Sequence, residues 1–174
     1  MRALHRRLRG GEADVLLIDR NNYHLFTPLL YQVATGELPP HAVAYPLRQT
    51  VVRESGYGFR QTDVEGIDVE RRCVVTSDGP FAYDHLVLSV GSVTNDYGIP
   101  GVKEHALGMK YLEDAREVRR RILSCFEHAD SVADEARRRE ILTFAIVGAG
   151  PVGVELSSSM RDLFDHYQNE HRRR

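Results

Sequence analysis

Apolar runs mark three stretches of the chain as predicted strands. Residues 14–19, 85–90 and 141–147 read DVLLID, HLVLSV and ILTFAIV. Runs with such an unbroken apolar centre are typical of strands buried on both faces of a parallel sheet. Residues 59–75 alternate like further strands, and Ser77-Asp78-Gly79 then supplies a turn.

Helical patterns alternate with these predicted strands. The longest is amphipathic and runs from Leu112 to Ala129. Strands that alternate with helices predict an α/β fold with a parallel sheet. The expected helices are, in chain order, residues 1–9 ended by Gly10-Gly11, residues 29–33 before the Pro39-Pro40 interruption, residues 43–54 with Pro46 near the start, residues 112–129, and the segment from Pro151 onward.

Length and charge narrow the class of protein. The chain has 174 residues, enough for one full domain or two partial ones. Its net charge of -2 does not favour nucleic acid as a partner. No apolar run approaches the roughly 20 residues of a membrane span, and residues 1–9 lack the apolar core of a signal peptide. A cytoplasmic location is the resulting expectation.

Cysteines and arginine clusters carry no chemistry of their own in this interpretation. Cys73 and Cys125 lie too far apart for a redox pair, so both are expected to be packing residues. Histidine spacing indicates no metal site. Arginines cluster at 119–121, 137–139 and 172–174, where solvated helix faces are expected and weak attraction to anionic lipid is the alternative.

The clearest chemical motif is the glycine loop of residues 148–153, GAGPVG, between a predicted strand and a predicted helix. Gly148 permits the tight turn, Gly150 lets backbone amides approach a pyrophosphate, and Gly153 lets the helix pack on the strand. The sequence thus predicts a dinucleotide site at a helix N-terminus, with a plain strand-to-helix turn as the alternative. Glu170 lies near the spacing of a ribose-binding acid, but in a polar, helix-like tail, so it is not assigned that role.

A second candidate is Asp19, which closes the first predicted strand. An acidic side chain at this position binds ribose hydroxyls in dinucleotide folds. A solvated carboxylate at a strand end is the alternative interpretation of Asp19 alone.

Three stretches together resemble the type II NADH dehydrogenase family. The run from Ile18 to Gly36 reads IDRNNYHLFTPLLYQVATG and is similar to the family's D-x-x-N-Y-H-L-F-x-P-L-L-Y-Q-V-A-T-G. Residues 83–91 look like its Y-D-x-L-V-[IL]-A-x-G segment, and residues 148–156 resemble its second glycine motif, G-x-G-P-T-G-V-E-L. Order and spacing agree from Asp14 to Leu156.

The resemblance implies a Rossmann-like flavoprotein fold with two dinucleotide-binding domains, truncated here at both ends. Residues 1–110 would be a partial FAD-binding domain that lacks its first strand and glycine loop, and residues 111–174 the start of an NADH-binding domain. The implied activity passes a hydride from NADH to FAD and electrons to a quinone, in a protein peripheral to the cytoplasmic face of a membrane. Homodimerisation is left open.

The resemblance also implies roles for individual residues. Asp19 would bind the adenosine ribose of FAD. Thr27, Pro28, Gln32 and Gly91 would lie near the flavin. The loop of Gly148, Gly150 and Gly153 would take the NADH pyrophosphate, with Glu155 near the nicotinamide. No protein nucleophile is needed, because the cofactors carry the chemistry.

Two substitutions depart from the family pattern, and two alternatives stay open. Val90 and Val152 stand where the family usually has threonine, which removes a hydroxyl donor from each motif. Another FAD- and NAD-linked reductase of the same superfamily is one alternative. The other is a non-catalytic remnant that acts as a nucleotide-binding or interaction module.

Overall fold

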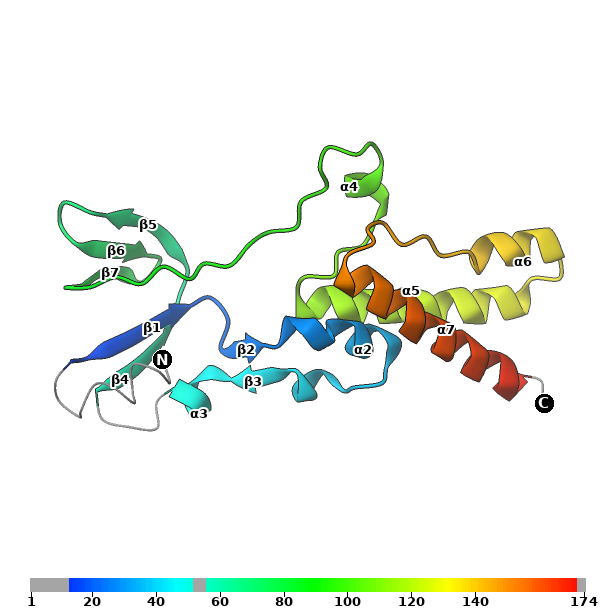
Figure 1. The fold of residues 1–174 in the computed structure, drawn as a ribbon, viewed down its shortest axis with the longest axis horizontal. Helices are drawn as coiled ribbons and strands as arrows, with labels where there is room; N and C mark the ends of the chain where they lie inside the picture. Colours follow the sequence, from blue (N-terminus) through cyan, green and yellow to red (C-terminus); the bar gives the residue numbers. More distant parts are fainter. Residues whose placement is uncertain (1–12, 52–55, 172–174) are drawn as a thin grey trace. The chain divides into compact units, whose positions relative to one another are not determined.

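The computed structural model describes residues 13–51 and 56–171, which form two compact units. The first holds the described residues up to His24 together with Ala44–Gly91, and the second holds Leu25–Val43 and the residues from Ser92 onward. The elements, labelled in Figure 1 where there is room, are β1 (Val15–Asp19), β2 (Tyr23–Leu25), the 3-10 helix η1 (Thr27–Leu29), α2 (Leu30–Thr35), the 3-10 helix η2 (Pro40–Ala42), β3 (Ala44–Pro46), α3 (Leu47–Val51), β4 (Tyr57–Gln61), β5 (Val64–Asp68), β6 (Cys73–Thr76), β7 (Gly79–Ala82), α4 (Val102–His105), α5 (Leu112–Ser131), α6 (Glu135–Ile141) and α7 (Pro151–His171).

In the first unit, β1 and β4 form a parallel pair whose register joins Val15 to Tyr57 and Asp19 to Gln61. The strand predicted at residues 14–19 is therefore confirmed. Its burial is lower than predicted, since Leu16 is 46% exposed. The reason is that β4 is the only strand paired with β1 among the described residues, and a strand is buried on both faces only within a covered sheet.

A three-stranded antiparallel sheet, β5-β6-β7, completes the strands of this unit. The turn predicted at Ser77-Asp78-Gly79 joins β6 to β7. The Thr76 hydroxyl donates to the Gly79 carbonyl at 2.7 Å and accepts from the Asp78 amide at 3.2 Å. Gly79 has φ +113°, a value that glycine reaches at no steric cost. The strand pattern predicted between residues 59 and 75 is confirmed.

The second unit has its core between helices. Ile122 and Phe126 of α5 pack with Met160 of α7, and the Phe126 ring stacks on Tyr167 at a centroid distance of 4.1 Å. Helix α2 contacts both α5 and α7 and buries its apolar face. The helices predicted around residues 29–33, 112–129 and from Pro151 are confirmed.

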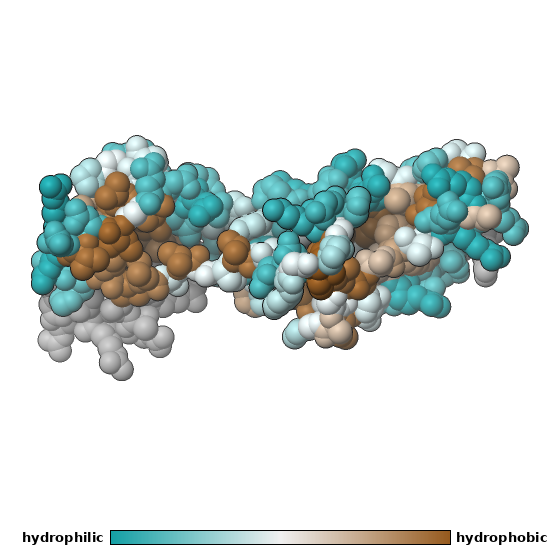
Figure 2. All heavy atoms as spheres, turned by 90° about the horizontal axis from the view of Figure 1, so that it is seen from above, coloured by the Kyte–Doolittle hydropathy of each residue, from teal (hydrophilic) through white to brown (hydrophobic). Residues whose placement is uncertain are grey.

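Two predicted buried strands are wrong. Residues 85–90 and 143–147 form neither helix nor strand, and Ile141 is the last residue of α6. Val87 and Val90 are 80% and 86% exposed. An apolar run becomes a strand only where a neighbouring strand takes its backbone hydrogen bonds, and no described strand pairs with either segment. Figure 2 shows hydrophobic patches among the hydrophilic surface of both units.

The helix predicted over residues 43–54 is partly wrong. Ala44–Pro46 forms β3, which pairs with β2, and the helix α3 begins only at Leu47. A pairing partner some twenty residues upstream thus overrides the local helical pattern. Residues 52–55 and the helix predicted at residues 1–9 lie outside the described residues. Within the described ranges, no helix is both long and apolar enough to span a membrane.

Candidate functional site

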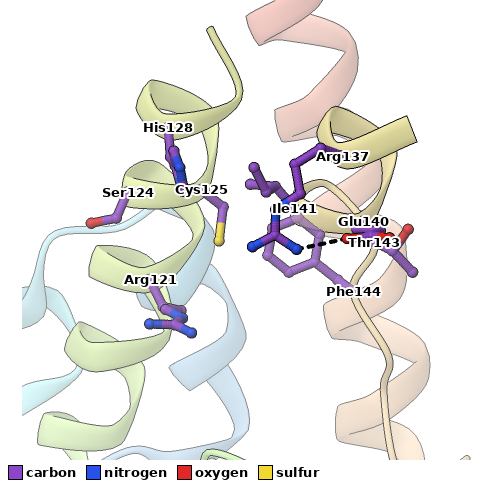
Figure 3. A pocket seen from close by; sticks show the side chains of 9 residues that line it. All are labelled: Arg121, Ser124, Cys125, His128, Arg137, Glu140, Ile141, Thr143 and Phe144. Atoms are coloured by element: carbon purple, nitrogen blue, oxygen red, sulfur yellow. Dashed lines mark hydrogen bonds and ion pairs between the residues drawn. The ribbon is translucent and has the colours of Figure 1, made fainter. Parts of the chain in front are cut away.

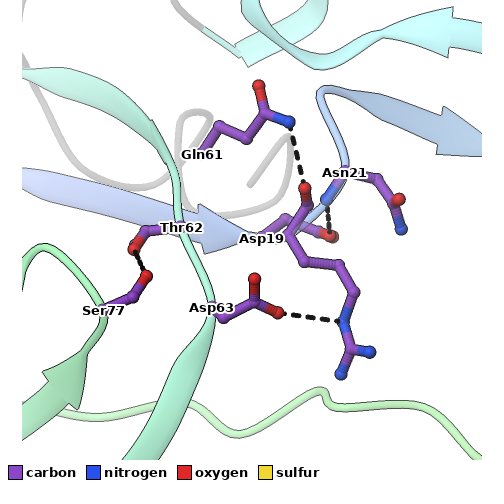
Figure 4. Close-up of polar contacts among 7 residues, drawn as sticks. Asp19, Asn21, Gln61, Thr62, Asp63 and Ser77 are labelled. Carbon is purple, nitrogen blue, oxygen red and sulfur yellow. Dashed lines mark hydrogen bonds and ion pairs between the residues drawn. The ribbon is translucent and has the colours of Figure 1, made fainter.

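Asp19 lies at the carboxyl end of β1, half-buried and opposite Gln61 of β4 (Figure 4). Its Oδ1 accepts the backbone N–H of Asn21 at 2.9 Å, and its carbonyl accepts the N–H of Thr62 at 3.1 Å. The Asn21 contact holds the carboxylate in one orientation. Its Oδ2 has no hydrogen-bond partner within the described ranges, so this oxygen can accept from a ligand hydroxyl at the strand end, where dinucleotide folds bind ribose.

Side chains around Asp19 brace this strand end. Gln61 Nε2 donates to the Arg20 carbonyl at 3.1 Å, and the Arg20 guanidinium lies 3.8 Å from an Asp63 carboxylate oxygen. The hydroxyl groups of Thr62 and Ser77 are hydrogen-bonded at 2.9 Å. These contacts, drawn in Figure 4, fix the backbone on both sides of Asp19 without occupying Oδ2.

The glycine loop leads directly into α7, whose first residue is Pro151. Gly148 has φ +110°, and a Cβ built on Gly153 would lie 2.1 Å from the Gly148 carbonyl oxygen. The loop and the helix therefore approach each other at a distance that only glycine allows. A Cβ on Gly148 or Gly150 would meet nothing within 4 Å. The space in front of these two residues is open, as a backbone cradle for a pyrophosphate requires.

Hydrogen bonding in the loop leaves the first amides of α7 available. The first hydrogen bond of the helix runs from the Val154 N–H to the Gly150 carbonyl at 3.1 Å. The N–H groups of Val152 and Gly153 precede it, and an α-helix offers no carbonyl to its first donors. Proline at the first position has no N–H to leave unpaired. Glu155 follows just beyond the first turn and is exposed.

The residues predicted near the flavin are spread over both units. Thr27 and Pro28 are exposed on η1, and Gln32 is half-buried on α2, where its carbonyl accepts the Leu38 N–H at 3.1 Å. Gly91 is exposed, with φ +71°, at the end of the first unit. The structure keeps Thr27, Pro28 and Gln32 on consecutive helical turns, whereas Asp19 and Gly91 belong to the other unit.

Sequence reasoning missed two residues that shape the Asp19 site. Asn21 orients the carboxylate through a two-residue turn, and the spacing Asp-x-Asn was a local signal for it, because Asp side chains favour such turns. The position of Gln61 beside Asp19 could not be predicted from the sequence. Its place beside Asp19 depends on the register between β1 and β4, strands that lie about forty residues apart.

Comparison with known proteins shows that the chain is similar to nucleotide-dependent oxidoreductases. Residues 2–173 match a family described as pyridine nucleotide-disulphide oxidoreductase. Over 167 residues the chain is 39% identical to the type II NADH:quinone oxidoreductase Ndh of Mycobacterium tuberculosis, covering 92% of this chain and 36% of the relative. A probable NADH dehydrogenase of Dictyostelium discoideum is also 39% identical over 167 residues, covering 90% of this chain and 36% of the relative.

A solved structure shows the same likeness. The structure of NDH2 from Plasmodium falciparum in complex with NADH superposes with a TM-score of 0.82 at 27% identity. That match covers 91% of this chain and 34% of the other. The chain thus spans about a third of the length of the relatives that it matches.

Proposed function

Because the chain belongs to the pyridine nucleotide-disulphide oxidoreductase family, we propose that the whole protein is an FAD-containing NADH:quinone oxidoreductase. The observation that carries this proposal is the open glycine loop at the start of α7, where the Gly153 contact fixes the turn and the space before Gly150 stays clear. The α/β, Rossmann-like fold class predicted from the sequence and the resemblance to type II NADH dehydrogenases are confirmed.

In the proposed function the chain binds and orients two nucleotides. The pyrophosphate of NADH lies against the N–H groups of Val152 and Gly153, with the positive end of the α7 dipole behind them. Gly150 has no side chain, so the pyrophosphate can come close to the backbone at this position. Glu155, one residue past the first turn, is proposed to lie near the nicotinamide.

The residues present also fit an FAD nucleotide. The Oδ2 of Asp19, which has no hydrogen-bond partner among the described residues, is suited to the ribose hydroxyls, and Asn21 holds that carboxylate in place. Thr27, Pro28 and Gln32, together with Gly91, are proposed to line the flavin side. Bound FAD supplies the hydride and electron chemistry, so the protein's own part is position and electrostatics.

Domain assignment follows the same proposal. Residues 1–110 contribute to FAD binding and residues 111–174 begin the NADH-binding domain.

The whole protein is proposed to work as a peripheral protein on the cytoplasmic face of a membrane, where it meets its quinone, and as a homodimer. Sedimentation with lipid vesicles and light scattering of the whole protein measure these two properties, and a monomer that stays in the supernatant would contradict both.

A second candidate function is nucleotide binding without turnover by the chain alone. It is favoured by the exposure of residues 85–90 and 143–147, because these segments flank the proposed cofactor sites without a sheet to hold them. The visible spectrum of the purified chain, with flavin quantified after denaturation, separates the two. Stoichiometric FAD together with NADH oxidation by a quinone supports turnover by the chain, whereas an absence of flavin supports the second candidate.

The glycine loop is tested by substituting Gly150 with valine. The added side chain fills the space in front of the loop amides, so NADH binding measured by calorimetry should be lost. Gly66 on β5 is a matched control, because a Cβ there also meets nothing within 4 Å, and Gly66→Val should leave NADH affinity unchanged. Equal affinity in the Gly150→Val protein would remove the loop from the proposed site.

A further inference from the structure

Two cavities on the second unit differ in how their charged groups are paired. The larger, about 500 Å³, lies between α5 and α6 (Figure 3). There Arg137 donates to the Glu140 carboxylate at 2.6 Å. The positive charge of one of the two arginines that line this cavity is therefore neutralised by a residue of the same lining. The smaller cavity, about 400 Å³, lies between α5 and the carboxyl-terminal end of α2. We call the smaller one the arginine cavity.

Charge in the arginine cavity is positive and unbalanced. Arg116 and Arg119, one turn apart on α5, line it together with uncharged residues only, namely Val33, Gly36, Leu38, Pro39 and Pro40. Neither arginine side chain has an ion pair or a hydrogen bond with another residue in the described part of the chain. The described wall therefore combines two cations with apolar carbon.

Arg119 is held in place at a cost. Its Nη1 is buried without a hydrogen-bond partner, and it packs so closely on Gly36 that a Cβ there would lie 1.5 Å away. An unpaired buried donor on a charged group is destabilising. The negative end of the α2 dipole lies beside it, but this partial charge belongs to a helix of only six residues. An anion in the cavity would offset the charge.

We propose that the arginine cavity binds a phosphate-bearing ligand with an apolar portion. Two guanidinium groups match the double negative charge of a phosphate better than the single charge of a carboxylate. Leu38, Pro39 and Pro40 offer the apolar surface for the rest of the ligand. A phosphate monoester with an apolar group has both features, and its binding is independent of the nucleotides of the proposed function.

Calorimetric titration of the full chain with three probes tests the proposal. The probes are hexyl phosphate, inorganic phosphate and hexanol, used at constant ionic strength and without NADH. Hexyl phosphate should bind saturably, and hexanol should not. Hexyl phosphate should bind more tightly than inorganic phosphate. Equal binding would show a site for phosphate alone and overturn the apolar part of the proposal.

Variants of α5 locate the site. Arg116→Met should weaken hexyl phosphate binding by about tenfold or more, the range for a lost hydrogen bond to a charged group, and Arg119→Met should do the same. Arg120 is the matched control, because it bonds to Glu117 and does not line the cavity. Since Arg116 is exposed, its variant decides the question even if Arg119→Met fails to fold. No saturable binding, or equal effects of Arg116→Met and Arg120→Met, would overturn the proposal.

Discussion

Substituting Gly36 with alanine tests the junction between α2 and α5. Gly36 ends α2 in the left-handed conformation, with φ +84° and ψ 12°. Alanine in that conformation costs about 1–2 kcal/mol. Its Cβ would also lie 1.5 Å from Arg119 Nη1 and 2.3 Å from Cζ, so the guanidinium must leave its place. The guanidinium is the far end of a flexible side chain, so moving it adds no more than about 1 kcal/mol of torsional strain.

Together these effects lower the stability of the chain by about 1–3 kcal/mol. For a protein of this size each kcal/mol lowers Tm by about 2–4 °C, so the Tm measured by circular dichroism should fall by about 2–12 °C. Gly66→Ala is the control, since its Cβ meets nothing and its φ is not positive. It should shift Tm by no more than about 1 °C.

A double-mutant cycle separates the two contributions. In an Arg119→Ala background the steric conflict is gone, and Gly36→Ala should cost only the backbone part, about 1–2 kcal/mol. Equal costs in the two backgrounds would show that the guanidinium contact carries none of the effect. A Tm unchanged by Gly36→Ala alone would refute both the left-handed cap and the contact.

Three further substitutions test the ribose site, the core and the surface. Asp19→Asn should raise the Kd for FAD by about tenfold, measured by flavin fluorescence, and an unchanged Kd contradicts the ribose assignment. Phe126→Ala should cost about 3–5 kcal/mol in urea unfolding, because the ring is buried in the helical core; a cost below about 1 kcal/mol would contradict that packing. The hydrogen bond from Arg120 lowers the pKa of Glu117, so any stabilisation is present above the ordinary carboxyl pKa and lost as the pH falls through the lowered one. Because the Glu117 side chain is 41% exposed and that of Arg120 is 63% exposed, solvent screens their interaction. Glu117→Gln should therefore leave Tm at pH 7 unchanged, and a clear drop would contradict this reasoning.

The sequence predicted elements whose stability is local or whose partner is close. The amphipathic pattern of α5 and the glycine loop before α7 were both recognisable, because a helix satisfies its own backbone hydrogen bonds. The runs at residues 85–90 and 141–147 carried an equally strong strand pattern and yet form no strand. A strand depends on a second segment for its hydrogen bonds, and that dependence is not visible in the residues of the run.

Long-range register limited the prediction of the site in the same way. Asp19 was identified from its position at the end of an apolar run, and its Oδ2 has no partner in the part of the chain that the structure describes. Its role in binding is still a prediction. The bracing by Gln61 depends on the β1–β4 pairing. The Arg119 contact with Gly36 depends on the packing of α2 against α5, which no periodicity within either helix encodes.

The chain crosses between its two compact units at His24–Leu25, Val43–Ala44 and Gly91–Ser92. Helix α2 therefore belongs to one unit but is encoded between two segments of the other. A truncated protein that ends at Gly91 would leave the apolar face of α2 without α5 and α7, and one that begins at Ser92 would lack α2 altogether. No single cut of the chain yields either unit by itself, because each unit is encoded by two segments that alternate with those of the other.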